Sequence, residues 1–545
     1  MRYSAYIASL LLATASAWQA MAHPASIGWR WALAIFAGLA VLGTWDLLQR
    51  RSTLRRNYPL LAHFRYGLES IGPEVRQYFI QSDLEEVPFS REQRSLVYQR
   101  AKGVMDVVPF GTEHDVYGVD YEWINHSIVP SAIPSHDFRV AVGAASPETT
   151  QPYPASVFNI SAMSFGALSA NAIRALNAGA KLGGFYHDTG EGSISPYHRE
   201  PGGDLVWEIG SGYFGCRDAD GHFSDERFAE NATTPQVKMV EVKLSQGAKP
   251  GHGGMLPGAK VSAEIARTRG VLEGVDCISP ARHAEFDTPI GLLEFVARLR
   301  RLSGGKPTGF KLAIGHPWEW FAIAKAMHET RLLPDFIVVD GAEGGTGAAP
   351  AEFVAHVGVP MHEGLRLVHN TLVGLGLRDQ VRVAAAGKIT SAFDIARTLA
   401  LGADWCNAGR GFMFALGCIQ SLSCHTDRCP TGIATQDMQR WKHLDVADKS
   451  NRVFMFHQNT LHALRDLLCA SGLDGPEQLG PEHILRRVSP TEVRSLAALY
   501  RFLEPGELLR RIPEHAVFRA FWADARPDSF APPATVKAMR TAKTL

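Results

Sequence analysis

The stretch Phe336-Ile-Val-Val-Asp340-Gly-Ala-Glu-Gly-Gly-Thr-Gly347 decides the fold, because an apolar β-branched run passes directly into a glycine-rich turn. The same succession recurs as Val381-Arg-Val-Ala-Ala-Ala-Gly387-Lys388 and as Asp404-Trp-Cys-Asn-Ala-Gly409-Arg410. Short apolar strands of this kind are typical of parallel sheets that are buried on both faces. These three segments therefore predict βαβ units whose strand ends carry a ligand site.

The alternation of strands and helices begins near residue 150 and continues through the middle of the chain. Polar or glycine-rich motifs follow nearly every predicted strand, which favours an α/β fold of the (β/α)8 TIM-barrel type over a doubly wound sheet. The predicted strands are 157–160, 238–244, 309–314, 336–339, 381–385 and 404–407, and the predicted helices are 171–182, 289–301, 318–331 and 391–401.

The overall composition narrows the class of protein. A chain of 545 residues is long enough for one large barrel with additional segments. Lysine plus arginine and aspartate plus glutamate each number 55, and this balance argues against nucleic acid as the main partner. The seven cysteines show no paired spacing, which fits a reducing compartment.

Two apolar runs near the N-terminus, residues 5–22 and 31–48, are each close to the length that spans a bilayer. Arginine is concentrated outside them, at Arg2 and in the segment 50–56. The positive-inside rule then predicts a helical hairpin in the inner (cytoplasmic) membrane, with the catalytic domain facing the cytoplasm. A cleaved signal peptide is the alternative, because Ala20-Met21-Ala22 matches a small-x-small cleavage site.

These observations predict four regions along the chain. They are two transmembrane helices (1–50), a small helical and mixed collar (51–145), the barrel (146–487) with a cysteine-rich segment at 418–429, and a helical tail (488–545).

Cys418, Cys424 and Cys429 form the only cluster of thiols in the chain. A cuboidal iron–sulfur cluster that lacks one corner iron needs three protein thiolates. A structural zinc ion needs four ligands, and His425 would supply the fourth. Free cysteines are also common in protein cores. From the thiols alone, the cluster, the zinc site and the buried core remain equal alternatives.

Other motifs indicate a cofactor and a charged substrate. The turns at Gly387 and at Gly409-Arg410 come late in the predicted barrel, where phosphate sites usually lie. The loop 245–260 combines glycines with Lys249 and Lys260, which suits a small carboxylated substrate. Lys311 lies within an apolar strand and therefore needs a partner; there it could stabilise negative charge on a reduced flavin.

With these motifs, residues 152–436 resemble the FMN-binding synthase domain of glutamate synthase. The motifs that carry the resemblance are Met163-Ser-Phe-Gly166, Thr189-Gly-Glu-Gly192, the loop 245–260, Ile278-Ser-Pro280, Phe310-Lys311-Leu312, the Gly-Gly-Thr-Gly loop, Gly417-Cys418 and Pro430-Thr-Gly-Ile-Ala-Thr-Gln436.

The resemblance implies a flavin- and iron–sulfur-dependent oxidoreductase that acts on CH–NH2 groups. Its reaction would be the reductive amination of 2-oxoglutarate, or of a related 2-oxo acid, to L-glutamate. FMN and a 3Fe-4S cluster would be the cofactors, and Cys418, Cys424 and Cys429 would hold the cluster. Lys249, Glu191 and Arg269 would contact the substrate. FMN would be held by Met163, Ser164, Gln246, Lys311, Gly344, Gly345, Gly387, Gly409 and Arg410.

The chain also departs from the family pattern. Met255 stands where the family motif has glutamine, so the exact oxo acid is open. The first cysteine is Cys216, so no N-terminal cysteine glutaminase is expected, and ammonia would come from a separate source such as an amidotransferase partner. No GxGxxG motif follows a predicted strand, which points to a separate electron-donor subunit.

Two other functions fit the same residues. In one, an amino or hydroxy acid is oxidised and its electrons leave through the cluster to an acceptor in the membrane. In the other, the barrel is catalytically silent and serves as a membrane-tethered binding subunit.

Overall fold

The computed structural model describes residues 3–49, 52–85, 87–534 and 536, which form two compact units, residues 1–90 and 91–545. This division differs from the predicted boundaries at residues 50 and 145. The first part of the predicted collar belongs to the N-terminal unit and the second part to the barrel unit.

The N-terminal unit is helical. Its elements are α1 (Ser4–Ala22), α2 (Ile27–Leu48), α3 (Thr53–Asn57), α4 (Leu61–Val75) and the π-helix η1 (Arg76–Ile80). Helices α1 and α2 pack closely because Gly43 has no side chain, and a Cβ there would lie 2.4 Å from the Tyr6 ring. Both are long and apolar enough to cross a membrane. The charges at Arg2, Arg50 and Arg51 lie outside the described residues.

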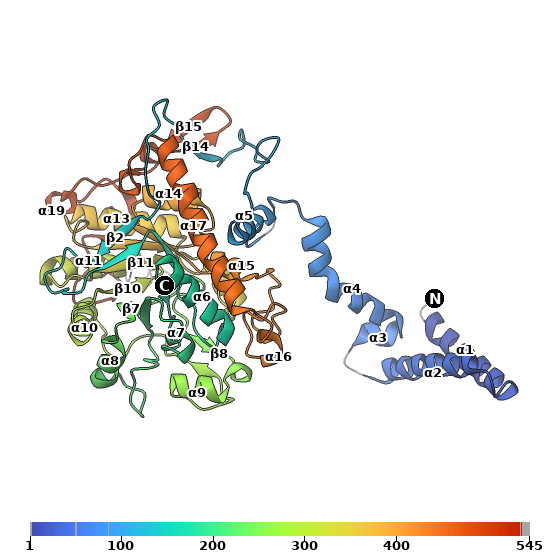
Figure 1. The fold of residues 1–545 in the computed structure, drawn as a ribbon. Helices are drawn as coiled ribbons and strands as arrows, with labels where there is room; N and C mark the ends of the chain where they lie inside the picture. Colours follow the sequence, from blue (N-terminus) through green and yellow to red (C-terminus); the bar gives the residue numbers. More distant parts are fainter. Residues whose placement is uncertain (1–2, 50–51, 86, 535, 537–545) are drawn as a thin grey trace, which may run out of the picture. The chain divides into compact units, whose positions relative to one another are not determined.

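The barrel unit is built around a closed, all-parallel barrel of eight strands, in the spatial order β10-β11-β12-β13-β4-β5-β6-β7 (Figure 1). The predicted (β/α)8 fold is therefore confirmed. The strands are β4 (Phe158–Ile160), β5 (His187–Asp188), β6 (Leu205–Ile209), β7 (Val237–Lys243), β10 (Thr308–Leu312), β11 (Phe336–Asp340), β12 (Arg382–Ala386) and β13 (Trp405–Ala408).

Six of these strands match the sequence prediction, but β5 and β6 were missed. Strand β5 has only two residues, His187 and Asp188, and both are polar. Strand β6 has an apolar run of only three residues, Leu205–Trp207, before Glu208. Neither segment has an apolar run as long as those on which the prediction depended.

Helices follow the strands and cover the outside of the barrel (Figure 1). Their ends are set by local sequence: the Ser169 hydroxyl accepts a hydrogen bond from the Ala172 amide at the start of α6, which ends at Gly184 with φ +62°. The helices in and beside the barrel are α6 (Ala170–Gly183), α7 (Pro196–Arg199), α8 (Asp225–Ala232), α9 (Ala263–Arg269), α10 (Pro289–Leu302), α11 (Pro317–Thr330), α12 (Ala351–His356), α13 (Met361–Gly374), α14 (Ala392–Ala400), α15 (Arg410–Leu416) and α16 (Met438–Trp441).

The long helix α17 (Val446–Ala470) packs against α6 and against α5 (Arg91–Lys102). Gly179 of α6 permits this approach, because a Cβ there would lie 2.5 Å from Cγ1 of Val453. His457 of α17 stacks on Phe185 with ring centroids 3.8 Å apart, and burial lowers its pKa to about 3. This histidine is therefore a neutral core residue.

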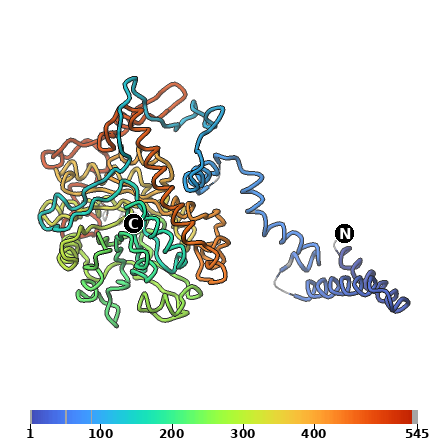
Figure 2. The backbone as a smooth tube through the Cα atoms, in the orientation of Figure 1, coloured from blue at the N-terminus to red at the C-terminus, as the bar shows by residue number. Residues whose placement is uncertain are grey.

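Chain segments far apart in sequence meet in a small sheet outside the barrel. Strand β1 (Glu122–Ile124) pairs antiparallel with β14 (Ile484–Ser489), which forms a hairpin with β15 (Glu492–Ser495). Figure 2 shows these blue-green and red stretches of the tube together. The prediction of a helical tail from residue 488 was therefore incomplete, because β15 precedes its helices α18 (Leu496–Leu499), α19 (Glu507–Arg510) and α20 (Ala516–Phe521).

Two further pairs of short strands complete the unit. Strand β2 (Arg139–Val142) pairs antiparallel with β3 (Tyr153–Ser156) just before the first barrel strand. Strand β8 (Met255–Leu256) pairs antiparallel with β9 (Cys277–Ile278) in the long loop region that follows β7. Short 3₁₀ turns lie at Gly258–Lys260 and Pro476–Gln478.

Candidate active site

The site forms at the carboxyl ends of the barrel strands, which all point to one side because the strands are parallel. Each loop that follows a strand brings predicted site residues to this side. Met163 and Ser164 follow β4, Glu191 follows β5, Gln246 and Lys249 follow β7, Gly344 and Gly345 follow β11, Gly387 follows β12, and Gly409 and Arg410 follow β13. Arg269 ends α9, and Lys311 lies within β10.

A carboxylate–ammonium pair joins the loop after β5 to the end of β7. Oε1 of Glu191 lies 2.9 Å from Nζ of Lys243, which also donates to Oε1 of Gln246 at 2.7 Å. Burial opposes ionisation of Glu191, but Lys243, with Arg269 and Lys249 nearby, holds the pKa of this carboxyl below its usual value. Glu191 is therefore an ionised group surrounded by cations.

Lys243 was not among the site residues predicted from the sequence. It is the last residue of β7, and a charged residue at the carboxyl end of a barrel strand was the available signal. Ser279, beside β9, was also missed as a site residue, and its hydroxyl lies 3.5 Å from Oε2 of Glu191.

Glycine at position 254 lets the loop after β7 come close to Glu191. A Cβ at Gly254 would lie 2.1 Å from Oε1 of Glu191, so any side chain would displace the carboxylate. The neighbouring Met255 is 42% exposed and pairs with Ile278 in the β8–β9 ladder.

The predicted clamp residues Lys249 and Arg269 are both buried in this region. Nζ of Lys249 donates to the Ala348 carbonyl at 3.1 Å, which joins the loop after β7 to the loop after β11. Burial lowers the pKa of Lys249, as does Lys243. Arg269 donates from Nη2 to the Phe165 carbonyl at 3.0 Å, while its buried Nε has no hydrogen-bond partner among the described residues.

The glycine loops after β11 and β13 gather around Arg410. Nη2 of Arg410 donates to the Glu343 carbonyl at 2.6 Å, and a Cβ at Gly345 would lie 2.9 Å from Nη1. At Gly409 the nearest atom to an added Cβ would be Sδ of Met163, 3.8 Å away. The structure thus brings together the predicted residues of β4, β11 and β13.

This arrangement fits the phosphate end of a flavin. Gly345 and Gly409 leave backbone exposed for close approach, and Arg410 supplies the charge that pairs with an anion. Burial lowers the pKa of Arg410 to about 10, while Asp340 and Glu343 oppose the change, so its guanidinium remains charged at neutral pH. A Cβ at Gly387 would lie 3.0 Å from Oε1 of Glu343, which places the turn after β12 beside the same loop.

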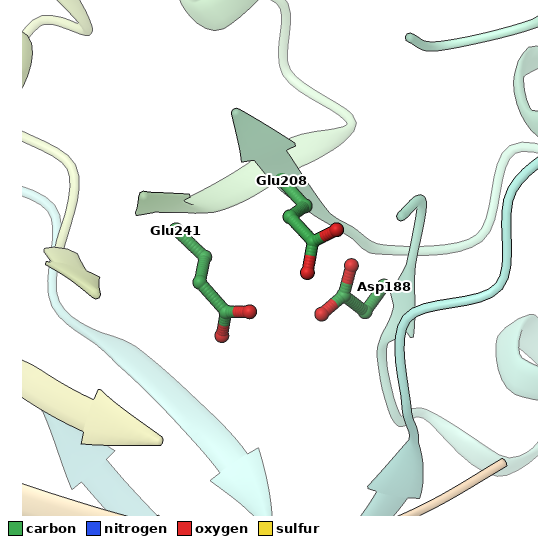
Figure 3. Close-up of side chains that lie close together, drawn as sticks. All are labelled: Asp188, Glu208 and Glu241. Carbon is green, nitrogen blue, oxygen red and sulfur yellow. The ribbon is translucent and has the colours of Figure 1, made fainter. Parts of the chain in front are cut away.

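Lys311 has two carboxylate partners inside the barrel. Its Nζ is paired with Oε2 of Glu208 and lies 3.3 Å from Oε1 of Glu241. Figure 3 shows Glu208, Glu241 and Asp188 pointing toward one another, and one oxygen from each lies within 4.8 Å of the others. The requirement for a partner is met, whereas contact of Lys311 with a flavin ring stays a prediction.

If all four groups were ionised, the three carboxylates and one ammonium would carry a net negative charge inside the barrel, which burial disfavours. Burial, reinforced by Glu208, raises the pKa of Asp188 to about 7. Burial likewise raises the pKa of Glu241. Burial disfavours the charge on Lys311, but Glu208 and Glu241 outweigh it and raise its pKa. The sequence analysis singled out Lys311 but missed Glu208 and Glu241, although each is also a charge within an apolar strand.

In the segment 418–429, which carries three cysteines, Cys424 lies beside the loop after β11. A Cβ at Gly347 would lie 3.6 Å from Cβ of Cys424, and Nζ of Lys260 donates to the Cys424 carbonyl at 2.9 Å. Cys418, Cys424 and Cys429 are all free thiols. Three thiols on one segment beside the glycine loops are a suitable donor set for an iron–sulfur cluster.

The spacing of the thiols separates two of the alternatives. Among the described residues, the only set of three or more ligand atoms that all lie within 4.8 Å of one another is Asp188, Glu208 and Glu241. Ligands of one tetrahedral zinc ion, with Zn–S of about 2.3 Å, would lie closer together than this limit. As placed, the thiols do not form a ready tetrahedral set around a single ion, and an iron–sulfur cluster held by them stays a prediction.

Comparisons with known proteins place the chain in a family. Residues 137–474 match the family model for the conserved region in glutamate synthase. The glutamate synthase large subunit-like protein YerD of Bacillus subtilis is 37% identical over 84% of this chain and 94% of its own length. The archaeal glutamate synthase [NADPH] of Methanocaldococcus jannaschii is 36% identical over 61% of this chain, and the match spans 62% of its length.

The solved structures that align with this chain include flavocytochrome b2 with pyruvate bound. The TM-score is 0.42 and the sequence identity 13%, and the alignment covers 84% of this chain and 91% of that chain. At these values the likeness adds nothing to the assignment. The family model covers more than half of the chain, and the YerD match covers 84% of this chain and 94% of that protein. The chain therefore belongs to the glutamate synthase family and is an enzyme of the oxidoreductase class.

Proposed function

We propose that the protein reductively aminates 2-oxoglutarate, or a related 2-oxo acid, to L-glutamate, with ammonia from a separate source. The observation that carries this proposal is the group of Glu191, Lys243, Lys249 and Arg269 at the mouth of the barrel, beside the glycine loops around Arg410. A dicarboxylic substrate needs two cationic sites, and Lys249 and Arg269 provide them.

Each side chain has a distinct role in this proposal. Lys249 and Arg269 bind the two carboxylates and so orient the carbon that is reduced. Glu191 stays ionised next to Lys243, so its carboxylate accepts hydrogen bonds from the substrate nitrogen and favours the protonated imine. The Glu191–Lys243 pair also positions Gln246, which is predicted to contact the flavin ring.

FMN is the proposed cofactor, and membership of the glutamate synthase family supports it. When bound, FMN supplies a hydride and converts between one-electron and two-electron transfer. Arg410, Gly409 and Gly387 would hold its phosphate, and Gly344 and Gly345 would lie along it. Met163, Ser164 and Lys311 would complete the flavin site, with Lys311 stabilising negative charge on the ring.

A 3Fe-4S cluster held by Cys418, Cys424 and Cys429 is the proposed electron entry point. The three free thiols beside the Gly347 loop support it. A separate electron-donor subunit and a separate amidotransferase are the proposed partners. The apolar helices α1 and α2 support anchorage in the inner (cytoplasmic) membrane, with the barrel on the cytoplasmic side.

An anaerobic assay tests the reaction. The detergent-purified protein is reduced chemically and mixed with 2-oxoglutarate, ammonium or both, while the flavin absorbance is followed near about 450 nm, where oxidised flavin cofactors absorb. We expect rapid return of the band only when both reagents are present. Bleaching of the oxidised protein by an amino or hydroxy acid, with no return under the first conditions, would instead establish the oxidative direction. A protein purified without flavin would contradict both and favour a binding subunit.

Replacing Cys424 with serine tests the cluster. We expect Cys424→Ser to lose most of the bound iron and the associated electron paramagnetic resonance signal, because a hydroxyl is a much poorer ligand than a thiolate. Cys406→Ser is the matched control, since Cys406 is fully buried in β13 and has no assigned role. Unchanged iron content in Cys424→Ser would rule out the proposed ligand set.

A further inference from the structure

The helix α4 and the π-helix that continues it carry an exposed apolar stripe within the N-terminal unit. Phe64 is 71% exposed, and further large apolar side chains on the same face are also exposed. Their spacing of three and four residues places them along one side of the helix. The stripe consists of Leu61, Phe64, Leu68, Ile71, Val75 and Tyr78.

The opposite side of the helix is polar. Arg65 pairs with Glu69 at 2.7 Å, and Ser70 and Glu74 are exposed. Acidic and basic residues are balanced between Leu61 and Ile80, so no strong charge determines how this segment binds. The segment is therefore amphipathic, and burial of its exposed apolar face against another surface would stabilise it.

Contacts that hold the helix to the rest of its unit lie at its start. The buried carboxylate of Asp46, near the end of α2, accepts from the Leu60 amide at 3.1 Å and lies 2.9 Å from Nε2 of His63. Ala62 is buried, and Tyr66 bonds to Ser52 at 3.1 Å. Beyond Tyr66 no residue of the helix is buried, among those whose burial is described. An isolated helix of about 15 residues is marginal in water, so this one needs a surface that buries its stripe.

The position of the attachment identifies that surface. Asp46 lies at the end of the second apolar helix, where α2 would leave the bilayer. The outer sides of α1 and α2 are themselves apolar, with Leu11, Val41 and Trp45 all more than 60% exposed.

The residues at the junction suit the headgroup region. Trp45 and Tyr58 are exposed aromatic residues of the kind enriched at membrane interfaces. Arg56 of α3 is exposed and precedes the stripe, and cations there would attract anionic lipid headgroups. The apolar surface continues past the stripe to Phe79 and Ile80, which are 84% and 71% exposed. With these two residues, the apolar surface is wider than the interface by which two helices pair in a coiled coil.

We infer that α4 and η1 lie in the plane of the bilayer interface, with Phe64, Leu68 and Ile71 among the acyl chains and Arg65, Glu69 and Ser70 in water. The inference rests on the proposed membrane location of α1 and α2. In this placement, α4 with η1 is a third membrane-bound element, and it holds the segment that follows the α1–α2 hairpin along the membrane surface. A lipid surface, not a second protein chain, is the partner.

Spin-label accessibility in the full chain tests this placement. Single cysteines are introduced as Phe64→Cys, as Ser70→Cys on the polar face, and as Val41→Cys on α2, and the labelled wild type serves as the background for the native thiols. The proteins are reconstituted into nanodiscs of phosphatidylethanolamine and phosphatidylglycerol. Collision rates of the label with oxygen, which concentrates in lipid, and with a water-soluble nickel chelate are then compared.

We expect the Phe64→Cys label to collide several-fold more with oxygen than with the chelate, and the Ser70→Cys label to show the reverse. A Phe64→Cys label that is open to the chelate would place the stripe in water and overturn the inference. A label that is shielded from both reagents would indicate protein contact, such as a second copy, and would also overturn it.

The Val41→Cys label separates this inference from the proposal on which it rests. A lipid-exposed label at position 41, with a water-exposed or shielded label at position 64, would leave the hairpin anchored and reject only the interfacial helix. A label at position 41 that is open to the chelate would reject both. The flavin assay does not depend on either result.

Discussion

Replacing Lys311 with methionine is expected to destabilise the barrel by about 3–5 kcal/mol, because the change leaves buried carboxylates without their cation. Glu208 and Glu241 are each about 2% exposed or less and both pair with Lys311. Methionine has a similar length but no charge, so the effect measures the loss of the ion pairs and not the creation of a cavity. The apparent melting temperature of the detergent-purified protein should fall by several degrees, and the yield of folded protein should fall with it.

Two further variants show whether charge is the cause. Asp188→Asn should be mild, because burial and Glu208 raise the pKa of Asp188 to about 7, and an amide oxygen can still accept the bond from the Gly190 amide. The double variant Lys311→Met with Glu208→Gln should recover part of the lost stability, since it removes one of the carboxylates that are left without a cation. A melting temperature of Lys311→Met equal to that of the wild type would show that the carboxylates are protonated together, without need of the cation.

Replacing Lys249 with methionine is expected to lower kcat/KM for the 2-oxo acid by about 10²- to 10³-fold, which corresponds to roughly 3–4 kcal/mol of transition-state binding. The removal of one member of a buried charge pair usually has an effect of this size. In the absence of substrate, Lys249 bonds to a single carbonyl, that of Ala348, so the fold should tolerate the change. Steady-state kinetics in 2-oxo acid concentration, with thermal unfolding in parallel, measures both effects.

Lys181→Met is the matched control, because Lys181 is an exposed lysine of α6 that also bonds to a carbonyl, that of Pro201. It should leave kcat/KM unchanged. Equal kinetics for Lys249→Met and Lys181→Met would remove Lys249 from the substrate site. A large loss in melting temperature for Lys249→Met would instead assign it a structural role between the loops after β7 and β11.

The barrel could be predicted from local sequence, because six short runs of four to seven residues are each followed by glycine or polar residues, and this succession has few structural solutions. Strands β5 and β6 were not predicted, because β5 has only two residues and the apolar run of β6, Leu205–Trp207, ends after three residues at Glu208. Lys311 could be singled out from the sequence, because an isolated charge in an apolar strand requires a partner.

Which charged side chains meet depends on the tertiary structure. Glu191 and Lys243 are 52 positions apart, and Lys311 meets Glu208 and Glu241 from two other strands, so no local pattern pairs them. The closed order of strands, in which β10 pairs with β7 and β13 with β4, brings these side chains together. Composition and periodicity report each element separately, whereas the barrel's register sets the distances, burial and pKa values on which the chemistry depends.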